Sequence, residues 1–145
     1  MTSAENADYG YDDSGWPVLV IVEPTTPASD AVFRAHLEKT KRYYERGERF
    51  GFIVDVRNSS PLPADKRRLL AEFIDQSLQT YGPLLVGTAL VASSSIFHSM
   101  LKTFLWLRQF QEPPTKVFST VDDGRAWLRG KLNPRRAASS DARQL

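Results

Sequence analysis

Between Trp16 and Leu132 the chain alternates short apolar runs, rich in β-branched residues, with longer stretches that repeat with the period of a helix. Short apolar runs bounded by turn residues are typical of buried strands, and longer helical periods are typical of helices that pack on one side. Four such strand-then-helix units in succession predict an α/β fold. The expected architecture is a mostly parallel sheet of about four strands alternating with four helices.

Proline, glycine and hydroxyl side chains set the expected limits of these elements. The expected strands are residues 18–22, 50–56, 85–92 and 116–119. Thr26 is expected to cap the first helix with Pro27 at its first position, and Gly47 to end it. Gly82 is expected to end the second helix, and Thr120 to cap the last one. The third helix is expected over residues 96–111.

One domain accounts for most of the 145 residues, and it lies between an acidic head and a basic tail. We expect the domain over residues 16–132, a flexible acidic segment over residues 1–15 and a flexible basic tail over residues 133–145. The chain has no cysteine and no apolar run near the ~20 residues of a membrane-spanning helix. These features predict a cytoplasmic protein without a transmembrane segment.

Polar side chains follow the expected strands, at the edge where parallel sheets bind their ligands. This predicted crevice comprises Asp55, Arg57, Ser59, Ser60 and Ser94. One interpretation is functional: the helix after Ser94 would attract an anion, and Asp55, alone or paired with Arg57, would serve a function such as that of an enzyme. The other is structural: Asp55 accepts N–H groups of its own turn, and the serines cap helices. We favour the structural interpretation.

The motifs that normally accompany catalysis are missing from the sequence. It contains no G-x-G-x-x-G after a strand, no phosphate-binding P-loop and no G-x-S-x-G elbow. The two histidines, His36 and His98, have no partner at metal-ligand spacing. We therefore predict no enzyme, no catalytic residue, no cofactor and no metal. The arginines of the tail are too few to predict nucleic-acid binding.

The expected third helix is apolar around most of its circumference. Such a helix is either deeply buried or covered by a partner, and a four-strand domain offers little deep burial. We therefore expect a homodimer or a protein partner. The predicted interaction surface comprises Phe97, Met100, Leu101, Phe104 and Trp106. Two alternatives stay open: these residues wrap the core, or helix and sheet enclose a pocket for an apolar or anionic small molecule, lipid-like or a nucleotide.

Three segments together resemble one known family and cover most of residues 17–132. They read RYYERGERFGFIVDVRNSSPLPADKRRLLAEF, LLVGTALVASSSIFHSMLKTFLWL and TKVFSTVDDGRAWLRGKL. The chain resembles bacterial STAS-like domains related to the anti-sigma-factor antagonist SpoIIAA, in the branch compared with lipid-binding CRAL-TRIO domains. The resemblance implies a non-catalytic regulatory domain that acts through partners. Phosphorylated members open the second helix with Asp-Ser-Ser-Gly, whereas residues 61–66 here read Pro-Leu-Pro-Ala-Asp-Lys, so phosphoregulation does not carry over.

Overall fold

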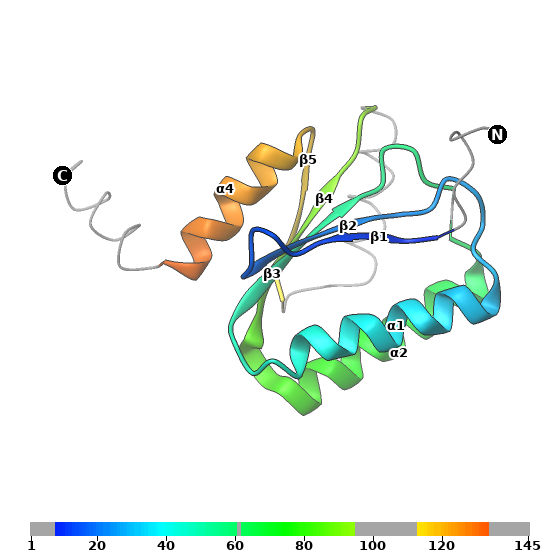
Figure 1. Ribbon diagram of the computed structural model, residues 1–145, viewed down its shortest axis with the longest axis horizontal. Helices are drawn as coiled ribbons and strands as arrows, with labels where there is room; N and C mark the ends of the chain where they lie inside the picture. Colours follow the sequence, from blue (N-terminus) through cyan, green and yellow to red (C-terminus); the bar gives the residue numbers. More distant parts are fainter. Residues whose placement is uncertain (1–7, 61, 95–112, 134–145) are drawn as a thin grey trace.

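A five-stranded sheet forms the centre of the protein (Figure 1). The computed structural model describes residues 8–60, 62–94 and 113–133. The strands are β1 (Gly10–Asp12), β2 (Val18–Val22), β3 (Phe50–Asp55), β4 (Leu85–Val91) and β5 (Thr115–Phe118). They lie side by side in sequence order. Strands β2 to β5 are parallel, and β1 pairs antiparallel with β2, so the predicted mostly parallel α/β sheet is confirmed.

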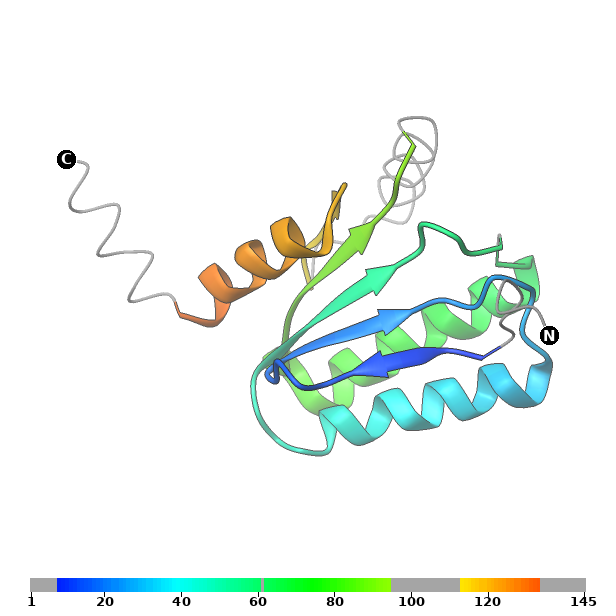
Figure 2. The same cartoon turned by 45° about the horizontal axis from the view of Figure 1, so that its top comes forward.

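The described helices cover both faces of the sheet. They are α1 (Asp30–Tyr44), α2 (Ala64–Tyr81), the short 3-10 turn η1 (Gly82–Leu84) and α4 (Val121–Leu132). In both views α1 and α2 run side by side on one face, and α4 lies on the other (Figures 1 and 2). The helix expected over residues 96–111 lies outside the described residues.

Strand β2 shows why the sheet is covered on both sides. Successive side chains of a strand point to opposite faces, so a continuous apolar run has to be buried on both faces of the sheet. Val18 and Val20 join the cluster under α4, whereas Leu19 and Ile21 join the cluster under α1 and α2. All four are buried, and only Val22, at the end of the strand, is 44% exposed.

Helix α4 approaches the sheet closely because glycines line its contact. Gly51 of β3 and Gly87 of β4 are partners in the ladder. A Cβ atom on Gly51 would lie 2.7 Å from Leu128 Cδ2, and one on Gly124 of α4 would lie 2.9 Å from the Cβ of Ala89. These missing side chains let the fully buried Leu128 pack directly against the strands.

The helix ends follow the expected chemistry with one correction. Gly47 and Gly82 have positive φ angles of 73° and 61°, as predicted for residues that end helices. Thr120 caps α4 by accepting the N–H of Asp123 at 3.1 Å. The cap of α1, however, is Ser29, whose hydroxyl accepts the N–H of Val32, and the helix begins three residues later than the Thr26 prediction required.

Strand β1 corrects the prediction of a flexible segment over residues 1–15, as far as that segment is described. Tyr11 pairs with Ile21 in the ladder, and its ring packs on the face covered by α1 and α2. Further along, Trp16 stacks on Phe50 at 5.4 Å between ring centroids. A three-residue strand is too short to give a periodic signal. The prediction of a flexible segment therefore depended on its polar, acidic composition alone. Of the predicted tail over residues 133–145, only Asn133 is described.

Candidate functional site

The carboxyl ends of four parallel strands meet at one edge of the sheet, where α/β proteins bind their ligands. Such sites form where the strand order reverses and two neighbouring crossovers diverge. Here β1 to β5 lie in sequence order, so the described sheet contains no reversal. The loops after β2 and β3, beside the starts of α1 and α2, instead form a small cavity.

Of the predicted crevice residues, Asp55, Arg57 and Ser59 make hydrogen bonds within the loop after β3, and Ser60 makes one to the loop after β2. Arg57 donates from Nε to Asp55 Oδ1 at 2.9 Å and from a terminal nitrogen to Oδ2 at 2.7 Å. These bonds hold the pKa of Asp55 below its ordinary value. Ser59 donates to the carbonyl of Val56, and Ser60 to that of Thr25 at 2.8 Å. Ser60 thereby ties the two loops together.

The remaining predicted site residues are Ser94 and the five residues of the predicted interaction surface. Ser94 is exposed after β4 and is the last described residue before residue 95. The predicted interaction surface of Phe97, Met100, Leu101, Phe104 and Trp106 lies outside the described residues, as does the pocket predicted beside it.

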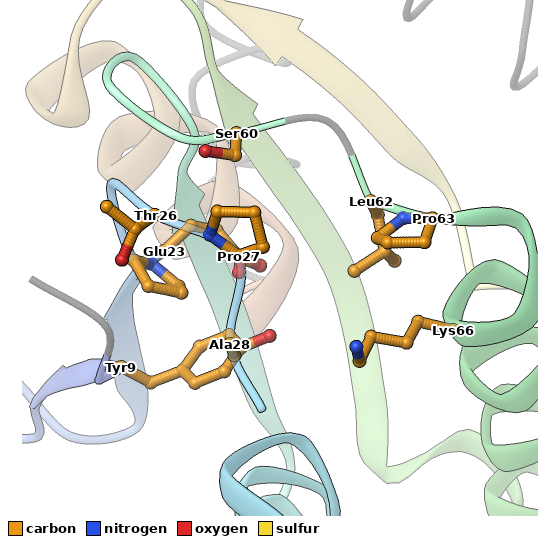
Figure 3. Close-up of a pocket in the computed structure, with 10 residues that line it drawn as sticks. Tyr9, Glu23, Thr26, Pro27, Ala28, Ser60, Leu62, Pro63 and Lys66 are labelled. Atoms are coloured by element: carbon orange, nitrogen blue, oxygen red, sulfur yellow. The ribbon is translucent and has the colours of Figure 1, made fainter. Parts of the chain in front are cut away.

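The cavity lies between the loop after β2 and the start of α2 (Figure 3). It is lined by Tyr9, Glu23, Pro24, Thr26, Pro27, Ala28, Ser60, Leu62, Pro63 and Lys66. Its volume of about 20 Å³ suits a water molecule, whereas pockets for larger ligands measure several hundred Å³. Ser60 is the one predicted crevice residue on its wall.

Two ionisable side chains face the cavity from opposite walls (Figure 3). Glu23 follows β2 and hydrogen bonds with the Tyr9 hydroxyl, and burial raises its pKa to about 7. A carboxyl with such a pKa exchanges protons at neutral pH. Lys66 of α2 is buried with 9% exposure and pairs with Asp30 of α1 at 3.3 Å.

A buried histidine, His36, lies behind the Tyr9 wall, and it is not among the site residues predicted from sequence. The Tyr9 and His36 rings stack with centroids 3.7 Å apart and planes 3° from parallel. The Tyr11 hydroxyl hydrogen bonds with His36 Nδ1. Burial lowers the pKa of His36 to about 4. The alternation of Tyr9 and Tyr11 before an apolar strand was the available signal, but it lies in a segment read as flexible.

Neither a metal centre nor a membrane span emerges from the described ranges. Residues 8–60, 62–94 and 113–133 contain no group of three or more His, Cys, Asp or Glu side chains placed to hold a metal ion. No described helix is long and apolar enough to cross a bilayer. Comparison of the chain with protein-family models, curated proteins and solved structures finds no match.

Proposed function

We propose that the protein is a non-catalytic, STAS-like regulatory domain that acts through a second copy of itself or through a partner protein. The observation that carries the proposal is that the polar side chains after the strands hydrogen bond with other groups of the protein. Asp55 and Arg57 bind each other, and Ser60 binds the neighbouring loop. Side chains engaged in this way stabilise a scaffold, and they are not poised toward a substrate.

The size of the described cavity supports the same proposal. A volume of about 20 Å³ is far below that of a typical substrate or cofactor site. Binding through a protein surface requires no deep cavity, because affinity comes from a few large apolar or aromatic anchors. The segment over residues 96–110 supplies such anchors in the sequence, among them Phe104 and Trp106.

Light scattering of the purified full chain tests the self-association half of the proposal. We expect a species heavier than the 16.4 kDa monomer, and we expect Phe104→Glu or Trp106→Glu to shift it to the monomer. Leu78→Glu is the matched control, because Leu78 is an apolar residue of α2 that is 39% exposed. A wild-type monomer whose mass none of the variants changes would contradict self-association.

A partner-capture experiment tests the other half. Wild-type protein and Trp106→Glu are immobilised side by side and offered the same cell extract, and each bound protein is then identified and titrated in purified form. We expect a partner that binds wild type and the Leu78→Glu control with equal affinity and Trp106→Glu at least tenfold more weakly. Equal binding to all three proteins would contradict a role for the 96–110 segment.

A further inference from the structure

Tyr9 contacts two titratable groups at once, the buried His36 and the half-buried Glu23. Its ring lies flat on the imidazole of His36, and its hydroxyl hydrogen bonds with the carboxyl of Glu23. Tyr11 points to the same face of the sheet and adds a hydrogen bond to His36 Nδ1. Tyr9 and the strand β1 that follows it therefore cover an acid that follows β2 and a base that belongs to α1.

This cover is attached by few bonds. Strand β1 is three residues long and pairs on one side only, with β2, at the edge of the described sheet. Side chains supply much of its attachment: Lys39 lies 4.2 Å from the Tyr11 ring centroid, and Arg46 pairs with Asp13 at 3.1 Å. Short edge segments with exposed attachments open at a small fraction of the free energy of global unfolding.

In the described part of the chain, the side chains that face Glu23 and His36 form no ion pair with either group. Glu23 faces Tyr9, Tyr11 and, across the cavity, Lys66, which pairs with Asp30. The rings around His36 are those of Tyr9, Tyr11 and Phe33. Neither Glu23 nor His36 takes part in an ion pair of the described residues. Burial without a counter-ion favours the neutral form of an acid and of a base alike.

We propose that β1 is a latch that opens and closes over Glu23 and His36, and that these two groups keep its closure nearly independent of pH by responding in opposite directions. Opening hydrates both side chains. Rising pH then favours the open state through ionisation of Glu23, and falling pH favours it through protonation of His36. The shifted pKa values, about 7 for Glu23 and about 4 for His36, are displaced by similar amounts.

Opening would have a defined structural consequence. Without β1, the backbone groups of β2 from Val20 to Val22 become a free edge of the sheet, a surface that another strand can pair with. The latch does not rest on the proposed partner binding through residues 96–110, because Tyr9, Tyr11, Glu23 and His36 all lie outside that segment.

Amide hydrogen exchange tests the latch directly. Protection factors of residues 10–12 and of their partners Val20 and Val22 are measured from pH 4.5 to 7 in the wild type, Glu23→Gln and His36→Asn. Because protection factors are corrected for intrinsic exchange, they report opening. We expect the wild-type values to change by less than about threefold, since the two linkage effects cancel.

In the two variants the protection factors should change with pH in opposite directions. In Glu23→Gln only His36 titrates, so protection should fall on the order of tenfold or more as the pH falls from 6.5 to 4.5. In His36→Asn only Glu23 titrates, so protection should fall on the order of tenfold or more as the pH rises from 4.5 to 7. A steep wild-type profile, flat variants, or variants with the same slope would overturn the proposal.

A second measurement applies even if His36→Asn loses the latch altogether. The ring protons of His36 are titrated by NMR in Tyr9→Leu, which keeps an apolar cover, and in Tyr9→Ala, which removes it. We expect the pKa of His36 to stay well below 6.5 in the wild type and in Tyr9→Leu, and to return toward 6.5 in Tyr9→Ala. An unchanged pKa of His36 in Tyr9→Ala would show that β1 is not its cover and would overturn the proposal.

Discussion

Arg57 binds the carboxylate of Asp55, two residues earlier, through two side-chain hydrogen bonds and a backbone N–H bond of 3.1 Å. The Asp55 side chain is 11% exposed at the end of β3, where an unpaired charge would be costly. The pairing explains how a carboxylate can end a buried strand, and it makes this feature part of the scaffold.

Replacing Arg57 with alanine should destabilise the protein modestly at neutral pH. The Arg57 side chain is 40% exposed, so solvent weakens the pair, and we expect a loss of about 1 kcal/mol in the free energy of unfolding. The pKa of Asp55 is depressed below 3.8, so the stabilisation is present above that pH and is lost as the pH falls through the folded pKa. Urea unfolding at pH 7 and pH 3 measures both effects. Arg57→Lys, which keeps the charge without the paired geometry, should lie between the two proteins; an Arg57→Ala deficit that persists at pH 2 would contradict this account.

The Glu23→Gln variant should become more stable relative to the wild type as the pH rises. The pKa of Glu23 is raised from 4.5 to about 7, so the wild type is favoured below pH 4.5 and loses this contribution as the pH rises through 7. Glutamine does not ionise and has no such loss. The difference in free energy of unfolding between the variant and the wild type should therefore shift by about 3 kcal/mol in favour of the variant between pH 4.5 and pH 7.5. Urea unfolding across this range measures the shift, and a constant difference would show that Glu23 titrates normally.

Two glycines of α4 should respond oppositely to alanine. A Cβ on Gly124 would meet the Cβ of Ala89 at 2.9 Å, whereas a Cβ on Gly130 would meet nothing within 4 Å. We expect Gly124→Ala to cost about 1–3 kcal/mol through overpacking, and Gly130→Ala to gain up to about 1 kcal/mol through helix propensity. Thermal unfolding of both variants compares them directly. Equal effects at the two positions would mean that α4 does not pack on β4 as described.

The cap of α1 distinguishes the observed helix start from the predicted one. Ser29 accepts the N–H of Val32 at 3.2 Å, so Ser29→Ala should lower the free energy of unfolding by about 1 kcal/mol. Thr26→Ala is the control, because Thr26 lies on the cavity wall before the helix begins, and it should cost clearly less. Chemical unfolding of both proteins decides between the two caps, and a larger loss in Thr26→Ala would favour the start predicted from sequence.

The apolar runs and the turn residues predicted most of the fold correctly, because each depends on the backbone geometry and burial of a few neighbouring residues. The apolar run at Val18–Val22 had to be a strand covered on both faces, and Gly82 had to end a helix, since both conclusions depend only on backbone geometry and burial. The predicted start of α1 was wrong because threonine and serine are both common helix caps, so the sequence does not distinguish Thr26 from Ser29. Which one begins the helix depends on how the loop after β2 crosses to α1.

The site was less accessible from the sequence. The Asp55–Arg57 pair was expected beside the functional interpretation, and backbone N–H bonds to Asp55 were the structural one. Both contacts are present. The cluster of Tyr9, Glu23 and His36 was not predicted. Its members lie directly before β1, after β2 and on α1, and nothing in their spacing along the chain brings them together.

The sequence by itself determined the α/β class, the parallel order of strand and helix, and the positions of most of the strands and helices. Each of these follows from interactions within a few residues or from the need to bury an apolar run. Only the tertiary structure decided that a short segment near the N-terminus becomes an edge strand and that its two tyrosines enclose an acid and a base. A strand of three residues such as β1 has little stability of its own, so its place depends on the side chains of β2 and α1 that it meets across the fold.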